Sequence, residues 1–195
     1  MTAHINTPAI DTPSPCRHPL IMSNFSESPA PASPPRKGDG SCAAQVETPI
    51  GRLTVTEQDG AITSLLWNRD GNAGAALQET PLLREALDQL SAYFDRRLTR
   101  FDLPLKLSSS PFERQVQQAM IAIPHGETLT YGDIARELGS YGQPVGQACG
   151  KNAIPIIVPC HRVLSAQGLG GFSGEGGVEM KIHLLKHEGG YPFLV

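Results

Sequence analysis

Three reactive side chains stand side by side at Cys160, His161 and Arg162, directly after the apolar run 154–158. A thiol close to an imidazole or a cation has a lowered pKa, and the thiolate that it forms is a strong nucleophile. Neighbours on an extended chain point to opposite sides, so we expect a water molecule to bridge the Cys160 thiol and the His161 imidazole. The triplet predicts nucleophilic chemistry at Cys160, with Arg162 in a structural role.

A purely structural interpretation of the same residues stays open, because free cysteines are commonly buried and inert. Pro155 and Pro159 weigh against it, since proline cannot donate to a ladder of hydrogen bonds and an ordinary central strand is therefore excluded.

The glycine-dense segment 168–177 follows the triplet, with Phe172 and Ser173 at its middle. No Gly-Lys-Ser/Thr follows it, so the segment is not indicated as a phosphate-binding loop. Its glycines favour instead a flexible lid, or a backbone that closely approaches a flat ligand. The next segment predicts a helix with Val178, Ile182 and Leu185 on its apolar face, ending at Gly189. Glu188 is unfavourably placed at the end of that helix; it is either a surface charge or the group that orients His161.

Together with "TPIGRLTV", "SPFERQVQQAMIAIPHGETLTYGDIA", "VGQACGKN" and "GGFSGEGGVEMKIHLLKHEG", the stretch "IPIIVPCHRV" resembles the O6-alkylguanine-DNA alkyltransferases, also called methylated-DNA–protein-cysteine methyltransferases. The resemblance extends over roughly residues 47–189. It implies an α/β (α+β) fold, with a ribonuclease-H-like N-terminal α/β domain and a mainly helical C-terminal domain that is winged helix-turn-helix-like.

The resemblance also implies a role for each matching residue. Cys160 would take the alkyl group in a single turnover, after His161 and Glu188 draw off the thiol proton through water. Asn152 would belong to the same network, and Tyr131 would give a proton to the departing guanine. No cofactor and no metal are expected. The lesion pocket would be formed by Pro155, Val163, Phe172 and Ser173.

The implied partner is double-stranded DNA with a flipped O6-alkylguanine; O4-alkylthymine is a further candidate substrate. Gln143 stands where the family usually inserts an arginine, after a shorter turn and directly before Pro144. Glutamine fills space and forms hydrogen bonds but lacks the cation's attraction to phosphates. Candidate phosphate contacts are Arg114, Arg136 and Lys151.

The whole chain has 195 residues and a formal net charge of −3, which excludes a globally basic nucleic-acid coat but not a local basic patch. Residues 1–42, rich in proline and serine, predict a disordered tail, in which Met22 is a possible alternative start. No membrane span, no signal peptide and no zinc-like cysteine spacing is indicated. We expect a cytoplasmic monomer.

Two domains are expected after the tail, over residues 43–105 and 106–195. The first would carry strands in "RLTVTEQ" and "AITSLLW", a turn at Asp59-Gly60 and a helix ending near Phe94, and would serve as a scaffold without chemistry. The second would open with a capping box between Ser110 and Glu113 and a second helix start at Thr130. Short helices with glycine turns are compatible with a helix-turn-helix.

Two other classes of function compete with alkyl transfer. A non-catalytic protein that binds the lesion on the same fold would lack the nucleophile, which this chain keeps at Cys160. A cysteine hydrolase built on Cys160, His161 and Glu188 would need an oxyanion hole and turnover, and adjacent cysteine and histidine give poor geometry for it.

Overall fold

The computed structural model describes residues 41–67, 76–172, 174 and 176–190, and these belong to one unit that spans residues 38–195. Most of the expected tail lies outside the described residues, and its last residue, Cys42, already begins the first strand. No helix within the described ranges is long and apolar enough to cross a membrane.

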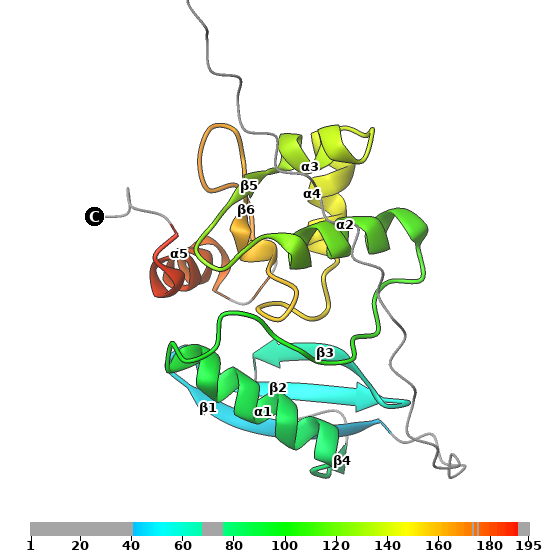
Figure 1. The fold of residues 1–195 in the computed structure, drawn as a ribbon, viewed down its shortest axis with the longest axis vertical. Coiled ribbons are helices and arrows are strands. Elements are labelled where there is room, and N and C mark those ends of the chain that lie inside the picture. Colours follow the sequence, from blue (N-terminus) through cyan, green and yellow to red (C-terminus); the bar gives the residue numbers. More distant parts are fainter. Residues whose placement is uncertain (1–40, 68–75, 173, 175, 191–195) are drawn as a thin grey trace, which may run out of the picture. The chain divides into compact units, whose positions relative to one another are not determined.

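The N-terminal half contains a four-stranded sheet in the order β3-β2-β1-β4 (Figure 1). Its strands are β1 (Cys42–Thr48), β2 (Gly51–Gln58), β3 (Ala61–Trp67) and β4 (Ala76–Leu77). The expected strands in 52–67 are present and antiparallel, and Asp59 and Gly60 join them with positive φ angles of 55° and 77°. Such a turn matches the twist of a tight hairpin. Strands β1 and β4 were not predicted from the sequence.

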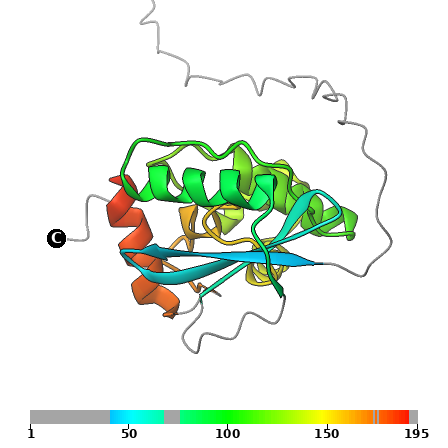
Figure 2. The ribbon, with the colours of Figure 1, turned by 90° about the horizontal axis from the view of Figure 1, so that it is seen from below.

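Helix α1 (Pro81–Phe94) packs on β1 and β2, and Figures 1 and 2 show it lying along the sheet. Thr80 caps its start by accepting a hydrogen bond from the backbone amide of Leu83. Leu83, Ala86, Leu90 and Tyr93 recur at helical spacing and are fully buried. The periodic apolar stripe therefore fixes which side of α1 faces the sheet.

The C-terminal half is mainly helical. Its elements are α2 (Pro111–Ala122), β5 (Leu129–Thr130), α3 (Tyr131–Glu137), α4 (Gly142–Gly150), a 3₁₀ turn (Cys160–Arg162), β6 (Val163–Leu164) and α5 (Gly177–Glu188). Helix α4 packs against both α2 and α3, and a short turn with Gly139 at φ 62° separates it from α3. This is the arrangement of a helix-turn-helix, so the expected fold class is confirmed.

The two expected helix starts are capped differently from the expectation. Thr130 and Asp133 form a capping box at the start of α3, each side chain bonding the other's backbone amide. Ser110 precedes α2 but makes no side-chain cap hydrogen bond. The capping box at Ser110 is wrong because Glu113 is engaged elsewhere, accepting from the Ser108 hydroxyl at 2.6 Å and pairing with Lys151 at 2.6 Å.

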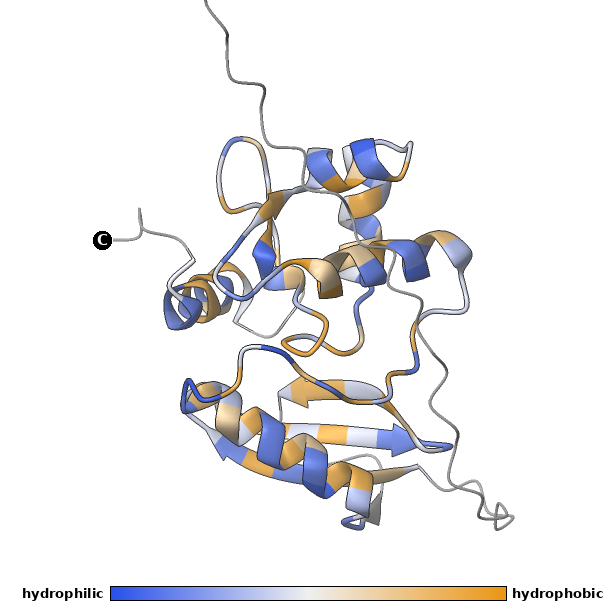
Figure 3. Cartoon of the chain, in the orientation of Figure 1, coloured by the Kyte–Doolittle hydropathy of each residue, from blue (hydrophilic) through white to orange (hydrophobic). Residues whose placement is uncertain are grey.

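The segment before Cys160 joins the two halves of the unit. The backbone amide of Leu65 in β3 donates to the carbonyl of Ala153 at 2.9 Å. Residues 154–158 are buried in the same apolar core as the inner strands, and the loop before Cys160 is hydrophobic in Figure 3. The reactive triplet is therefore anchored to the core on its N-terminal side.

Candidate active site

The loop 152–159 is a compact turn and not a strand, as the two prolines predict. Asn152 holds it together, since its side chain donates to the Val158 carbonyl at 2.8 Å and accepts from the Ile154 amide at 3.2 Å. Ile156 adopts a φ of 73°, a costly conformation for a β-branched residue. Backbone strain of this kind persists only where surrounding contacts enforce it, so the position of Cys160 is strongly determined.

Cys160 begins the 3₁₀ turn and is only 5% exposed. Burial raises the pKa of the thiol, while a hydrogen bond from Asn152, the nearby Lys181 charge and backbone amides act in the opposite direction. The expected lowering of the thiol pKa is therefore wrong for the free protein, because desolvation of the thiolate dominates. A thiol in this state needs a base to remove its proton.

His161, the next residue in the chain, is the candidate base for this step. Its Nε2 lies 2.8 Å from Oε1 of Glu188, and both side chains are fully buried. Burial lowers the pKa of His161 and outweighs the contact with Glu188, which raises it. The net lowering favours the neutral imidazole. With Nε2–H donating to Glu188, Nδ1 carries the free lone pair, and it has no hydrogen-bond partner among the described residues.

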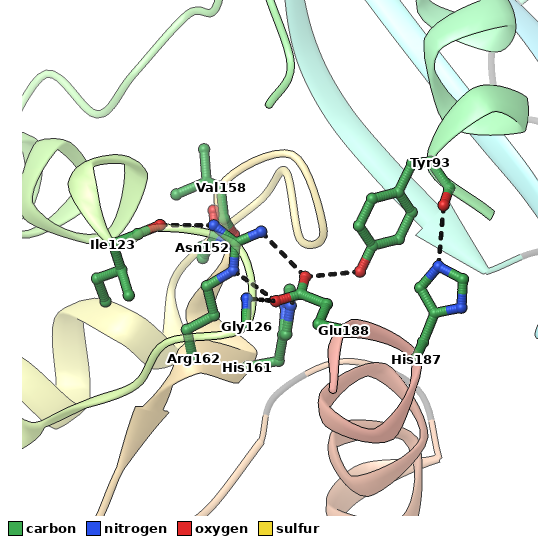
Figure 4. A network of polar contacts seen from close by, with 9 residues as sticks. All are labelled: Tyr93, Ile123, Gly126, Asn152, Val158, His161, Arg162, His187 and Glu188. Atoms are coloured by element: carbon green, nitrogen blue, oxygen red, sulfur yellow. Dashed lines mark hydrogen bonds and ion pairs between the residues drawn. The ribbon is translucent and has the colours of Figure 1, made fainter. Parts of the chain in front are cut away.

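Glu188 is the centre of a buried network, drawn in Figure 4. Arg162 donates two hydrogen bonds to this carboxylate, from Nε to Oε2 at 2.8 Å and from Nη2 to Oε1 at 3.0 Å. Its Nη1 donates to the Ile123 carbonyl. Burial on its own raises the pKa of Glu188, but the hydrogen bonds from His161 and Arg162 outweigh it and hold the pKa well below its usual range. The fixed anion explains why a carboxylate stands at the end of α5, and, within the described residues, the Arg162 side chain forms its hydrogen bonds with this anion and the Ile123 carbonyl.

Two further groups donate hydrogen bonds to the Glu188 carboxylate. The Tyr93 hydroxyl donates to Oε1 at 2.8 Å, and the Gly126 amide donates to Oε2 at 3.3 Å (Figure 4). Tyr93 belongs to α1, so the expectation that the first domain carries no chemistry misses its contribution. Its position in the apolar stripe of α1 gives no sign of a polar partner far along the chain.

A cavity of about 260 Å³ opens onto Cys160. Its walls are formed by Tyr131, Gly146, Cys149, Gly150, Gly171 and Phe172. Of the four residues expected in the pocket, only Phe172 lines this cavity; Pro155 and Val163 are buried and lie outside its lining, and Ser173 lies outside the described residues. The Tyr131 hydroxyl donates to the Gly171 carbonyl at 3.3 Å, and burial raises the pKa of this phenol.

Lys181 is a functional candidate that the sequence interpretation missed. It is fully buried, and its Nζ donates to the carbonyls of Val163 at 2.6 Å and Gly171 at 3.1 Å. Its ammonium lies 5.9 Å from the centre of the Tyr131 ring. Burial lowers the pKa of Lys181 to about 8.

The buried face of α5 agrees with the expected one at Leu185 and differs at the other positions. It consists of Lys181, Leu184, Leu185 and Glu188, whereas Val178 is 41% exposed. Both polar members have buried partners, which compensates their desolvation. The spacing of Lys181 and Glu188, seven residues apart on one face, is the signal that could have indicated two buried charges.

The expected DNA contacts all lie on the surface. Gln143 is exposed in the first turn of α4, with Pro144 beside it, where proline is tolerated. Arg136 pairs with Asp133, Lys151 pairs with Glu113, and Arg114 donates to the carbonyls of Ser108 and Ser109. The structure therefore brings Cys160, His161, Glu188, Asn152 and Tyr131 to one centre and leaves Arg114, Arg136 and Lys151 outside it.

The site thus combines a buried thiol with a histidine–carboxylate pair, in a helix-turn-helix domain beside a small sheet, which is the architecture of a cysteine protein with a nucleic-acid-binding type of domain. Residues 111–190 match the family model of the 6-O-methylguanine DNA methyltransferase DNA-binding domain, and residues 43–107 match that family's ribonuclease-like domain. The chain belongs to the 6-O-methylguanine DNA methyltransferase family. The expected enzyme class, a methylated-DNA–protein-cysteine methyltransferase, is confirmed by this family membership and by the relatives below.

Similar proteins of known structure or known function belong to the same family. The O6-methylguanine methyltransferase of Mycobacterium tuberculosis superposes with a TM-score of 0.69 at 36% identity, over 76% of this chain and 93% of that one. A structure of the M. tuberculosis protein in complex with DNA gives 0.68 at 38% identity, over 76% and 92%. The constitutive methylated-DNA–protein-cysteine methyltransferase of Bacillus subtilis is 39% identical, over 73% of this chain and 92% of its own length.

Proposed function

We propose that this protein repairs DNA by moving the alkyl group of O6-alkylguanine onto Cys160, once per molecule. The observation that carries the proposal is a buried thiol that lines a cavity and is followed in the chain by His161, whose Nδ1 has no partner among the described residues and whose Nε2 is held by Glu188. A thiol with a raised pKa is unreactive until a base takes its proton, and the His161–Glu188 pair supplies that base.

The proposed reaction is a displacement at an sp³ carbon. His161 draws the thiol proton through a water molecule, the Cys160 sulfur forms a bond to the alkyl carbon, and the bond from that carbon to guanine O6 breaks. Tyr131, which keeps its proton because burial raises its pKa, protonates the departing guanine. The thioether product has no easy route back to the thiol, so one molecule removes one lesion.

A base within a duplex cannot reach a cavity whose floor is a buried thiol, so we infer that the nucleotide flips out of the helix. O4-alkylthymine offers a similar oxygen-linked alkyl carbon and is a second proposed substrate. Arg114, Arg136, Lys151 and Gln143 would face the DNA backbone or base stack, and the protein would act as a monomer on double-stranded DNA.

The test is transfer to a defined sulfur. The protein is incubated with a duplex oligonucleotide carrying O6-methylguanine, and intact and peptide masses are measured. We expect one added methyl group on Cys160, no addition to Cys160→Ala, and normal addition to Cys149→Ala, which removes the other thiol of the cavity. Absence of a methyl adduct with saturating duplex would overturn the proposal, and tight lesion binding without an adduct would point to a non-catalytic lesion binder.

A further inference from the structure

Tyr141 is the most exposed of the large apolar residues in the described part of the chain, at 81%. It is the N-cap residue of α4, with extended φ and ψ of −118° and 158°, and its side chain makes no capping hydrogen bond. A single exposed aromatic needs no explanation by itself, so its place in the fold decides whether it has a role.

Tyr141 lies at the start of α4, the helix that forms one wall of the cavity. Gly142, Gly146, Cys149 and Gly150 follow one another at helical spacing, and the last three line the cavity that holds Cys160. Gly142 belongs to the same face, because a Cβ added there would lie 3.8 Å from the Cβ of Tyr131, another wall residue. Tyr141 precedes Gly142 directly and is the exposed N-cap residue of the helix that carries this face.

The neighbouring positions offer no comparable group. Helix α4 and the turn before it, residues 138–150, contain no lysine or arginine, so this segment supplies no cation of its own to DNA. Gln143 is exposed but has no ring, Gly142 has no side chain, and Pro144 lacks a planar surface. Tyr141 is the one aromatic side chain of this segment, so base stacking is the contact that the start of α4 can make.

A flipped nucleotide leaves a gap in the base stack, and an inserted apolar or aromatic side chain can fill it. We propose that Tyr141 inserts its ring into the duplex where the lesion nucleotide leaves the stack, and holds the helix open while that nucleotide occupies the cavity. This inference rests on the proposed function, because it takes the cavity as the lesion pocket. It assigns to Tyr141, and not to Gln143, the filling of the gap in the base stack, and a phenol ring stacks without any positive charge.

The test measures binding without chemistry. Kd values are determined, in the Cys160→Ala background, for a duplex with O6-methylguanine and for one with an abasic site, which already contains the gap. Base–aromatic stacking predicts that Tyr141→Ala binds both duplexes about 5- to 150-fold more weakly. Tyr141→Phe should bind like the parent, and so should Leu66→Ala, which shortens another exposed apolar residue, at 59%, on β3.

Equal Kd values for Tyr141→Ala and the parent would overturn the inference, and so would a parent that binds neither duplex. A loss in Tyr141→Phe as large as in Tyr141→Ala would also overturn it, because the hydroxyl and not the ring would then make the contact. Methyl transfer to the protein with Cys160 intact tests the proposed function separately, since Tyr141 stacking in an abasic duplex requires no transfer.

Discussion

The hydroxyl of Tyr93 donates a hydrogen bond to Oε1 of Glu188 at 2.8 Å, across 95 residues of sequence. The same oxygen lies 2.8 Å from Nε2 of His161, so a side chain of α1 bonds directly to the carboxylate that orients the proposed base. The N-terminal half of the unit thereby contacts the proposed proton relay directly (Figure 4).

Tyr93→Phe removes this donor and keeps the ring packing. Because a buried acceptor loses one of its partners, we expect a loss of about 1–3 kcal/mol in the free energy of unfolding, and a several-fold slower transfer to Cys160. Urea denaturation and single-turnover rates with a methylated duplex measure both effects. Tyr141→Phe removes an exposed hydroxyl and serves as the matched control for stability. A Tyr93→Phe protein with the stability and rate of the parent would show that the contact is dispensable.

Glu188→Gln tests the electrostatic core of the site. The change leaves Arg162 buried without its anion, and we expect a loss of about 3–5 kcal/mol of stability, together with slow transfer because His161 loses its orienting charge. Thermal or urea unfolding checks the first effect, and the transfer rate at matched folded fraction checks the second. An active and stable variant would contradict the role assigned to the carboxylate.

The lowered pKa of Glu188 predicts that the free energy of unfolding depends on pH in the acid range. The pKa of this carboxyl is lowered in the folded protein, so the unfolded chain binds more protons as the pH falls below the unfolded value of about 4.3. The stabilisation from Glu188 is thus complete above that pH and is lost progressively below it. Unfolding free energies measured from pH 6 downward should fall more steeply for the parent than for Glu188→Gln, and parallel curves would refute this.

These contacts show what a single sequence reveals and what it does not. The turn at Asp59-Gly60, the stripe of α1 and the helix start at Thr130 depend on local chemistry, and each was predicted. Tyr93 and Lys181 were missed because their partners, Glu188 and the carbonyls of Val163 and Gly171, are brought to them only by tertiary packing. A tyrosine or lysine at a core position has no local feature that identifies such a partner.

The error at Ser110 has a similar cause. The spacing from Ser110 to Glu113 satisfies the local rule for a capping box, but Ser108 and Lys151 compete for the Glu113 carboxylate, and Lys151 lies far along the chain. The Cys160 thiol likewise has cationic neighbours in the sequence, yet its burial reverses the direction of the pKa shift that they suggest. In both cases a long-range effect outweighs a correct local preference.

Lys181→Met removes the buried ammonium close to the thiol. Since the charge of Lys181 lowers the pKa of Cys160, its loss should move the pH dependence of Cys160 alkylation by iodoacetamide to higher pH. Peptide mapping assigns the label to Cys160, and Lys186→Met, at an exposed position of the same helix, is the matched control. An unshifted profile for Lys181→Met would exclude an electrostatic effect on the thiol.

Gln143→Arg supplies the cation that the start of α4 lacks. If position 143 faces the duplex, the arginine adds about one phosphate or base contact, so binding strengthens and the slope of log K against log salt grows by about 1. Gln58→Arg adds the same charge at an exposed position of β2 and should leave the slope unchanged. Titrations at several salt concentrations separate the two variants. Unaltered binding and slope in Gln143→Arg would mean that the short turn before α4 directs position 143 away from DNA, and Tyr141 would then be the remaining candidate at this helix end for contact with the base stack.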